Sequence, residues 1–559
     1  MEGEKVKKKY TIGLDYGTLS GRGILTACEN GAVLASAVRE YDHGVMDTTL
    51  CAGQEALPGG WALQHPADYI AVLDSVVPEL LRQSGVDPRE ITGIGIDFTA
   101  CTMLPVDGDA VPLCEKEAFR GRRNAYVKLW KHHGAQKHAD RINRYLEEKD
   151  LADAPRFGGK VSPELLLPKV LEMLEEDPEL YEAADAILEA GDWLTRVLTG
   201  SHTRSCSMAG YKAWWNDREG YPDAEFFTDL DPRLASFTEK KLAGRVTGVG
   251  ETAGTLSAEW AARLGLCAGT VVAPTIIDSH AGVPGSGVGT KEQAMLVLGT
   301  SSVMVGLSET PCSGSGIMGG VKDAIVPGYY ALESGLASVG DLFGWFVDHC
   351  VPPCLVREAE EKGQNIHTLL SEKAARIAPG SSGLLALDWW NGNKTPFVDG
   401  GLKGALIGLS LNTKPEEIYR ALIESTAYGT RRILALYEEN GLSVREIICS
   451  GGIALKNPLL MQIYADVLGR PLKVAGSEQT AALGSAIYAA LSAGAGKGGY
   501  DRYAEAVRNM SKVRDIVYEP DGASHARYTE LYAVYQAFGE IMGSSSRGIM
   551  RRLSELQTE

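Results

Sequence analysis

The sequence predicts an α/β protein built from two similar lobes around a cleft. Its 559 residues are too many for one hydrophobic core, so two domains are expected. Apolar runs alternate with helical patterns in the first hundred residues and again from about residue 290. In both halves an apolar run ends in a turn of small residues, and a second apolar run follows. This shared opening indicates an internal duplication.

The first lobe is expected over residues 10–288, after a solvated, charged tail at 1–9. Asn30-Gly31 lies between two apolar runs and predicts a hairpin. Apolar residues at helical spacing predict a helix over 66–84. The predicted strands are 10–14, 22–28, 32–38 and 91–98.

Residues from about 105 to 245 break this alternation and are richer in helix and tryptophan, so we expect an insert that shapes a substrate pocket. A glycine-rich stretch at 285–292 is the expected hinge, and the second lobe is expected over 289–559. Its last part, 500–559, has the pattern of a charged, helical segment. The other elements predicted for this lobe are strands at 294–298, 303–307, 446–449 and 472–474, and helices at 457–468 and 479–491.

Charge and hydropathy exclude several classes of protein. The chain has 55 basic and 72 acidic residues, a net charge of −17, which argues against nucleic acid as a partner. It contains no apolar run of 18 residues, so no membrane span is expected, and the charged N-terminus lacks the apolar core of a signal peptide. We therefore expect a cytoplasmic protein without a membrane partner. A homodimer is compatible with the sequence.

Three turns carry the chemistry. The run at 10–14 leads to Asp15, and the run at 270–277 leads to Asp278. The run at 294–298 ends in Gly299-Thr300-Ser301, whose backbone N–H groups and hydroxyls can approach a phosphate closely. An acid for a metal, a small-residue turn for phosphate and a separate acid for a base together predict phosphoryl transfer.

Each acid has a predicted role and an alternative. Asp278 is the expected general base that takes the proton of the attacking hydroxyl, although a strand-end aspartate also caps turns. Asp15 is expected to orient Mg²⁺ through water, or to form its turn only. Arg22 is a phosphate ligand or a surface charge. The other candidates for phosphate contacts are Thr18, Ser20, Gly299, Thr300 and Ser301.

A polyol substrate needs several donors and acceptors. The candidates are Asp97, the backbone of Ala100, Lys212, and Glu333 in the loop expected after Tyr330. Lys212 lies among aromatic residues and either reaches a sugar oxygen or packs on a tryptophan face. The adjacent residues His132 and His133 point about 100° apart on a helix, so they cannot chelate one ion together, and a solvated helix face is predicted for them.

Two lobes with matching phosphate turns resemble the actin, hexokinase and chaperone ATPase superfamily, whose domains are ribonuclease-H-like. Within it the chain resembles the FGGY carbohydrate kinases. That family's second signature is a glycine-spaced apolar segment followed by an acid-ended helix, and it is found here at 404–409 and 417–424. The first signature, around a lysine and a tryptophan, is poorly met at 162–169, which weakens a match to xylulose or glycerol kinases.

Four further segments, at 125–133, 210–213, 278–281 and 388–393, resemble the family members that act on the ketopentose L-ribulose. The resemblance implies phosphorylation of L-ribulose on its 5-hydroxyl by MgATP in arabinose breakdown. It also implies that Gly451 and Gly452 form a platform for adenine, and that Asn457 contacts the nucleoside or only caps its helix. The alternatives are a kinase of xylulose, ribitol or glycerol, and an actin-like ATPase without kinase activity.

Overall fold

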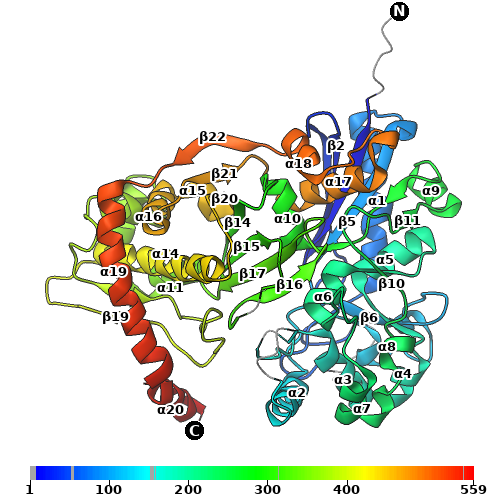
Figure 1. Cartoon of the computed structure of the whole chain (residues 1–559), viewed down its shortest axis with the longest axis horizontal. Coiled ribbons are helices and arrows are strands. Elements are labelled where there is room, and N and C mark those ends of the chain that lie inside the picture. Colours follow the sequence, from blue (N-terminus) through cyan, green and yellow to red (C-terminus); the bar gives the residue numbers. More distant parts are fainter. Residues whose placement is uncertain are drawn as a thin grey trace, which may run out of the picture.

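The computed structural model describes residues 8–51, 56–151, 156–157, 159–312, 314–545 and 547–558. Two lobes lie side by side, and each is built on a mixed β-sheet with helices on its faces (Figure 1). Among the described residues, no helix is long and apolar enough to span a bilayer.

The first sheet confirms the predicted opening of the chain. β1, β2 and β3 form an antiparallel meander, and β5 runs parallel to β1 on its other side. The predicted hairpin is present between β2 and β3, with Gly31 at φ 66°. The strands of this sheet are β1 (Tyr10–Tyr16), β2 (Ser20–Ala27), β3 (Val33–Glu40), β5 (Ile91–Phe98), β11 (Gly254–Thr255), β12 (Val271–Val272) and β13 (Ile276–Ile277).

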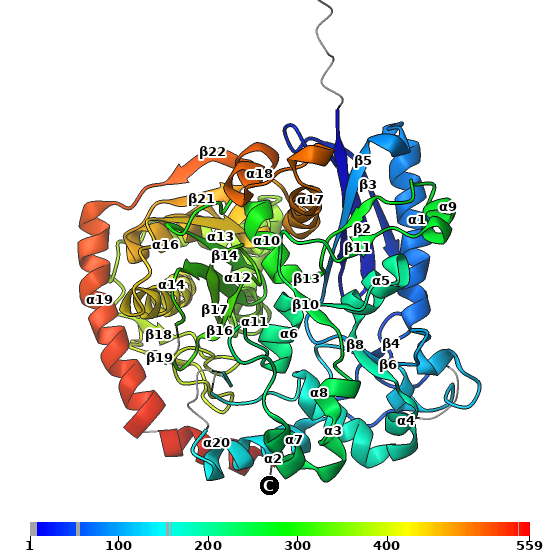
Figure 2. The same cartoon turned by 45° about the vertical axis from the view of Figure 1, so that its right-hand side comes forward.

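Two helices from opposite ends of the chain cover this sheet. α1 (Pro66–Ser84) packs on β2 and β3, and α17 (Thr480–Ala493) packs on β1 and β5 (Figure 2). A Cβ added to Gly13 would lie 1.9 Å from the carbonyl oxygen of Ala482, and one added to Gly95 would lie 1.9 Å from that of Ser485. The two glycines therefore let α17 lie directly on the strands, where any side chain would push it away.

The second sheet repeats the layout of the first. β14 is antiparallel to β15 and parallel to β20, as β1 is to β2 and β5. Tyr437 of α14 (Pro415–Glu439) donates its hydroxyl to the carbonyls of Met304 and Leu332, which fixes that helix on one face. The strands are β14 (Gln293–Leu298), β15 (Ser302–Ser308), β16 (Met318–Lys322), β17 (Tyr330–Leu336), β20 (Glu446–Ser450), β21 (Leu472–Ala475) and β22 (Val513–Tyr518).

The region expected as an insert at about 105–245 contributes to a separate sheet and apolar core, which contain Trp214 and also take in earlier residues such as Trp61 and strand β4. Its sheet consists of β4 (Leu63–Gln64), β6 (Met103–Val106), β7 (Val127–Lys128) and β8 (Ala186–Glu189), and a two-stranded sheet pairs β9 (Thr203–Ser205) with β10 (Arg245–Thr247). The helices are α2 (Gln136–Glu148), α3 (Leu166–Glu176), α4 (Pro178–Ala183), α5 (Ala190–Thr199), α6 (Cys206–Ala213), α7 (Ala224–Leu230) and α8 (Phe237–Lys240).

The remaining elements join or cover the lobes. Residues 500–559 were expected to be helical, but β22 adds a strand to the second sheet there; the prediction missed it because its side chains are mostly exposed and show no apolar alternation. The elements not yet named are α9 (Ala258–Leu264), α10 (Asp278–Ser286), α11 (Gly340–Cys350), α12 (Pro353–Glu361), α13 (Ile366–Ala374), α15 (Gly452–Lys456), α16 (Pro458–Leu468), α18 (Tyr503–Met510), α19 (Gly522–Glu540), α20 (Arg547–Thr558), β18 (Leu385–Leu387) and β19 (Ala405–Ile407).

Candidate active site

Three aspartates meet at the carboxyl ends of adjacent strands in the first lobe. Asp15 lies in β1 opposite Asp97 in β5, and Ile276 of β13 also pairs with Asp97. Asp278 follows β13 directly and is the first residue of α10, so it lies at a strand-to-helix junction and not at the tip of a long strand. Residues distant in the sequence therefore converge on one edge of the sheet.

The pKa of Asp278 is raised far above that of an ordinary aspartate. Burial raises its pKa to about 7; the charges of Asp15 and Glu333 add to this, while the Ser279 backbone hydrogen bond and the charge of Lys212 oppose it. The Ser279 N–H donates to Oδ1 at 2.6 Å. A carboxylate with a pKa near 7 is a stronger base than an ordinary aspartate and is still largely ionised slightly above neutrality.

Asp97 lies beside Asp15 on the neighbouring strand and is fully buried. The hydroxyl of Ser485 in α17 donates to its Oδ2 at 2.7 Å, and its Oδ1 has no hydrogen-bond partner among the described residues. Burial, followed by the charge of Asp15, raises its pKa well above the usual range. Asp97 was expected to bind the sugar, but its carboxyl has no exposed surface on which to do so.

Asp15 is the best placed of these groups to hold a cation. Its side chain is partly exposed, burial raises its pKa, and Arg22 lies opposite with Nε 3.4 Å from Oδ2. The pKa values of Asp15 and Asp97 are raised by burial, and each carboxyl lies close to the other, an arrangement that a divalent ion would stabilise in place of a proton. The residues present therefore fit Mg²⁺.

A second group of metal-ligand types, His43, Cys51 and His65, does not fit an ion as it stands. The ligand atoms lie within 4.8 Å of one another, but the two imidazole rings are stacked 4.5 Å apart at 18°. A bound metal lies close to the plane of each imidazole, and two nearly parallel stacked rings have no such common point. His65 also uses Nδ1 to accept the N–H of Ala67 at the start of α1.

The first phosphate turn joins β1 to β2. The Gly17 N–H donates to the Ser20 carbonyl at 3.0 Å, which closes the turn and leaves Thr18 and Ser20 partly exposed. The Thr18 hydroxyl accepts from the indole N–H of Trp130 at 3.1 Å. Arg22 lies in β2, with 44% of its side chain exposed beside Asp15, so it faces the same edge.

The second phosphate turn joins β14 to β15 in the other lobe. The Gly299 N–H donates to the Ser301 carbonyl at 3.0 Å, and the Thr300 carbonyl accepts from the Val339 N–H at 2.7 Å at the start of α11. Thr300 itself is exposed at the tip of the turn. The fold thus presents Gly299, Thr300 and Ser301 in the same way as Thr18 and Ser20, at the same end of the matching strand.

The two glycines of the expected adenine platform lie next to this turn. β20 runs parallel to β14 and ends at Ser450, so Gly451 reaches the carbonyl of Leu298, from which an added Cβ would be only 2.3 Å away. Gly452 is exposed, and nothing lies within 4 Å of the Cβ it lacks, which leaves a flat, open backbone surface. Asn457 caps α16, where its side-chain oxygen accepts the Leu460 N–H at 3.1 Å.

The expected sugar ligands Lys212 and Glu333 come from different lobes. Glu333 lies within strand β17, whereas a loop had been expected at this position. It accepts from Nε2 of the buried His280 at 2.9 Å, and Nδ1 of that ring lies 2.9 Å from the hydroxyl of Ser207. Burial acts to raise the pKa of Glu333, but the hydrogen bond from His280 and nearby positive charges hold it at about 2, so Glu333 is ionised.

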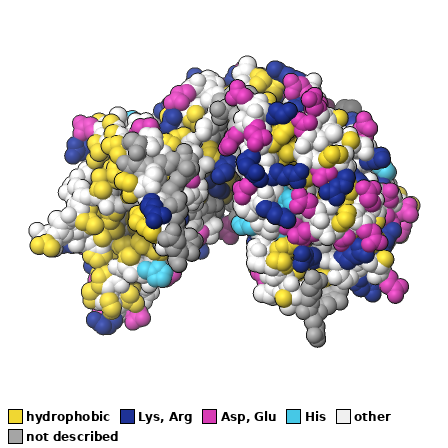
Figure 3. All heavy atoms as spheres, turned by 90° about the horizontal axis from the view of Figure 1, so that it is seen from below, with side chains coloured by type: hydrophobic (Ala, Val, Ile, Leu, Met, Phe, Trp, Pro, Cys, Tyr) yellow, Lys and Arg dark blue, Asp and Glu magenta, His cyan; other side chains and the backbone are white. Residues whose placement is uncertain are grey.

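Lys212 in α6 is buried, and Glu333 is among the acidic groups that raise its pKa against the opposing effect of burial. Ala100 follows β5 and is partly exposed beside the buried Thr99 and Cys101. A cavity of about 1010 Å³ opens between the insert and the second sheet, with Tyr211, Glu333 and Lys394 in its wall. Figure 3 shows the hollow between the two lobes from below.

Three residues that had not been predicted as site residues complete this site. His280 and Ser207 position Glu333, and Trp130 contacts the first phosphate turn. His280 follows Asp278 by two positions in the segment 278–281, which had been noted only as part of a resemblance. The residue pattern of segment 278–281 does not predict that the imidazole of His280 faces the other lobe.

Two comparisons with proteins of known sequence identify the family. The N-terminal domain of the FGGY family of carbohydrate kinases matches residues 10–285, and its C-terminal domain matches 294–493. The chain is 47% identical to the ribulokinase of Bacillus licheniformis over 539 residues, which cover 96% of this chain and 98% of that protein. It is also 47% identical to the ribulokinase of Halalkalibacterium halodurans over 550 residues, 98% of each chain.

Solved structures agree on the fold. The xylulose kinase of Rhodospirillum rubrum superposes with a TM-score of 0.77 at 24% identity, covering 95% of this chain and 98% of that one. The glycerol kinase of Plasmodium falciparum gives 0.76 at 15% identity, with coverage of 95% and 98%. These matches confirm the predicted α/β fold of two ribonuclease-H-like, actin-like lobes, and the domain matches cover most of the sequence. The chain belongs to the FGGY family of carbohydrate kinases.

Proposed function

We propose that the chain transfers the γ-phosphoryl group of ATP to the 5-hydroxyl of L-ribulose, giving L-ribulose 5-phosphate and ADP. The observation that carries this proposal is the pKa of Asp278, which is near 7. The charge of Lys212 in the first lobe and that of Glu333 in the second both act on this pKa. The names of relatives that are 47% identical over nearly the whole chain support L-ribulose as the sugar.

In this proposal Asp278 takes the proton of the attacking hydroxyl as the oxygen approaches phosphorus. The rest of the open-chain ketose extends toward the Ala100 backbone, Lys212 and Glu333. Lys212 donates to a carbonyl or hydroxyl oxygen, and the ionised Glu333 accepts from a hydroxyl. His280 and Ser207 hold Glu333 in place and need not touch the sugar.

ATP would lie between the phosphate turns of the two lobes. Thr18, Ser20 and Arg22 would contact phosphate from one side, and Gly299, Thr300 and Ser301 from the other. Adenine would stack on Gly451 and Gly452, and the amide group of Asn457, whose oxygen caps α16, still has N–H donors for the nucleoside. Asp15 would hold Mg²⁺ through water, with Asp97 as its buried neighbour. When bound, Mg²⁺ neutralises charge on the phosphates.

A homodimer and a cytoplasmic location complete the proposal. α20 exposes Ile549, Leu553 and Leu556, which a second copy of the chain would cover. Light scattering of the purified protein tests this, since a monomeric mass across the micromolar range would refute the dimer.

The test of the function is ADP release with a panel of sugars, followed by NMR of the product. L-ribulose should have the highest kcat/KM, and the new phosphorus coupling should be on carbon 5. Lys212→Met should chiefly raise KM for the sugar, because it removes binding to both ground and transition states. Higher kcat/KM with xylulose, ribitol or glycerol would replace L-ribulose with another substrate of the family. ADP release that no sugar accelerates would leave an ATPase.

A further inference from the structure

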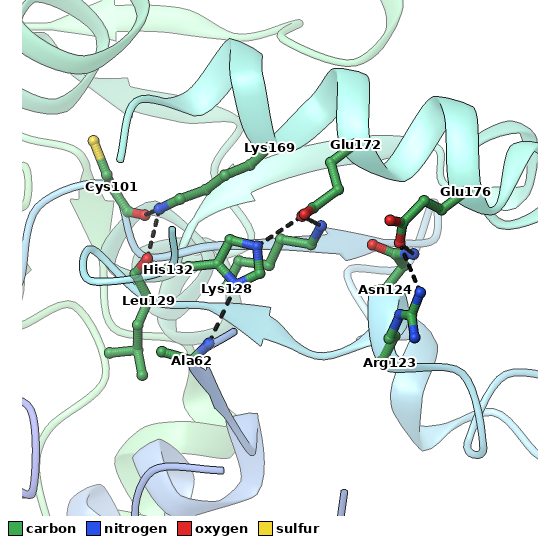
Figure 4. Close-up of polar contacts among 10 residues, drawn as sticks. All are labelled: Ala62, Cys101, Arg123, Asn124, Lys128, Leu129, His132, Lys169, Glu172 and Glu176. Carbon is green, nitrogen blue, oxygen red and sulfur yellow. Dashed lines mark hydrogen bonds and ion pairs between the residues drawn. The ribbon is translucent and has the colours of Figure 1, made fainter. Parts of the chain in front are cut away.

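A buried lysine of helix α3 forms hydrogen bonds to two separate loops near the proposed site. Lys169 is fully buried, and its ammonium donates to the carbonyl of Cys101 at 2.6 Å and to that of Leu129 at 2.6 Å (Figure 4). Cys101 follows Ala100, whose backbone is a proposed sugar ligand. Leu129 precedes Trp130, whose indole contacts the first phosphate turn. One ammonium therefore joins the segment that carries Ala100 to the segment that carries Trp130.

The loop that carries Ala100 is held in an unfavourable conformation. We call residues 99–102, between β5 and β6, the sugar loop. Cys101 has φ 54°, in the left-handed region that a residue with a side chain rarely adopts. Such a conformation persists only when the surroundings hold it. The holding contacts are the Thr99 to Thr102 hydroxyl hydrogen bond at 2.7 Å, the bond from the Ala190 N–H to the Thr102 carbonyl at 2.6 Å, and Lys169.

The same face of α3 fixes the other loop at both ends. Glu172, one turn after Lys169, accepts from the ammonium of Lys128 and lies 2.7 Å from Nε2 of His132, so the two residues that flank 129–131 are anchored (Figure 4). Nδ1 of His132 accepts the Ala62 N–H at 3.3 Å. The prediction that His132 lies on a solvated helix face is therefore wrong: it is fully buried and lies outside a helix.

We propose that Lys169 is a positioning residue of this kinase, which holds the sugar loop in its strained conformation and so presets the Ala100 backbone for the substrate. This inference rests on the proposed function, because it concerns the same sugar site. Without the ammonium, the Cys101 carbonyl loses its charged donor and the loop can relax to an ordinary φ. The Ala100 backbone then turns away from the position in which the sugar would meet it.

The chain offers a matched control in Lys241. It is also a buried lysine, and its ammonium donates to two backbone carbonyls, those of Tyr181 at 2.9 Å and of Ala184. Both acceptors belong to α4 or follow it, within the insert and away from the sugar loop. Lys241→Met therefore removes the same kind of interaction from the same lobe without touching a substrate-binding segment.

The experiment compares wild type, Lys169→Met, Lys169→Gln and Lys241→Met in the full chain. Sugar and ATP kinetics and the midpoint of thermal unfolding are measured for each. We expect Lys169→Met to lower kcat/KM for L-ribulose by roughly 10- to 100-fold, since small misplacements of binding groups have effects of this size. Lys169→Gln keeps two N–H donors and should restore part of the loss. Lys241→Met should unfold at a lower temperature and keep the wild-type KM for L-ribulose.

Two outcomes overturn the inference. One is a folded Lys169→Met enzyme with wild-type KM and kcat for L-ribulose. The other is the same loss of sugar kinetics in Lys241→Met, which would indicate general loosening of the insert. If Lys169→Met does not fold, the comparison of Lys169→Gln with Lys241→Met decides in the same way. Wild type that turns over another sugar refutes the proposed substrate, and the variants are then compared on that sugar.

Discussion

His280 of the first lobe donates a hydrogen bond to Glu333 of the second at 2.9 Å. Burial lowers the pKa of His280, so the ring is neutral at pH 7, and its Nε2 carries the proton because Nδ1 accepts from the Ser207 hydroxyl. The pair therefore joins the two lobes through a charged acceptor and a neutral donor. This arrangement fixes the tautomer and the direction of the Glu333 carboxylate.

Replacing His280 should weaken sugar binding without removing the base. His280→Phe keeps a ring but leaves the Glu333 carboxylate without its donor, and hydrogen bonds to charged groups are worth about 1.5–3 kcal/mol. We expect KM for the sugar to rise about 10-fold or more, with a smaller rise in Ser207→Ala, measured by steady-state kinetics. An unchanged KM in His280→Phe would show that Glu333 needs no partner from the other lobe.

Asp278→Asn should keep the shape of the site and remove the base. The turnover rate should fall by at least ~10², the usual contribution of a general base, while calorimetry shows sugar binding largely retained. Ser279→Ala is the control, because only the Ser279 backbone contacts Asp278, and it should retain most of its activity. Turnover near the wild-type rate in Asp278→Asn would remove Asp278 from the mechanism.

The pH profile should report the ionisation of Asp278. The base acts when deprotonated, so kcat/KM of the free enzyme should rise with pH through an apparent pKa of about 7. Rates measured from pH 5.5 to 8.5 with saturating MgATP test this. A profile that stays flat from pH 5.5 to 8.5 would mean that the pKa of this carboxyl is not raised.

The same ionisation should make Asp278 unfavourable for stability. Its folded-state pKa, about 7, lies above the ordinary value of 3.8, so the folded state binds more protons than the unfolded state between these values. The unfolding free energy should therefore fall as pH rises from about 4 to 7. Asp278→Asn lacks this pH-dependent contribution to the unfolding free energy. The stability of the variant minus that of wild type should therefore be larger at pH 8 than at pH 4. Equal pH dependence in both proteins would contradict this.

Gly452 and Gly451 should respond differently to substitution. Gly452→Leu places a side chain in open space on the proposed adenine platform, so we expect a higher KM for ATP with unchanged sugar KM and thermal stability. Gly451→Ala puts a Cβ against the Leu298 carbonyl at a φ of 95° and should lower stability by more than ~1 kcal/mol. A normal KM for ATP in Gly452→Leu would argue that adenine binds elsewhere.

The lobes should close when both substrates bind. The phosphate turns face the cleft from opposite sides, and closure would exclude water and limit wasteful hydrolysis of ATP. Small-angle scattering should give a smaller radius of gyration with L-ribulose and a non-hydrolysable ATP analogue than without ligands. Identical curves would refute closure.

Features that are determined by neighbouring residues could be predicted from the sequence, and features that depend on distant segments could not. The helix over 66–84 and the strand over 91–98 match α1 and β5 at both ends, because apolar spacing and turn residues act within the segment. The approach of Asp15 to Asp278 depends on strand pairing: β1 and β13 both run parallel to β5, so their carboxyl ends lie at one edge of the sheet. Strand β22 was missed because an exposed edge strand has no apolar alternation.

The parts of the site that the sequence left open depend on contacts between distant segments. Asp97 was assigned to the sugar, but the pairing of β5 with β1 places it beside Asp15, and the packing of Ser485 in α17 buries it. Glu333 was expected in a loop after Tyr330, yet pairing with β15 places it within a strand. The residues next to Asp97 and Glu333 in the sequence do not predict either of these long-range contacts.

The position of α17 has a consequence for the way the chain is made. The ribosome releases β1 and β5 early, but the helix that covers one face of them comes much later: Ser485, which binds Asp97, is 388 positions further along. At about 5–20 residues per second, this face stays bare for roughly 20–80 s during synthesis. One face of the first sheet therefore stays exposed to chaperones and to neighbouring chains on the polysome until α17 has been synthesised and packs on it.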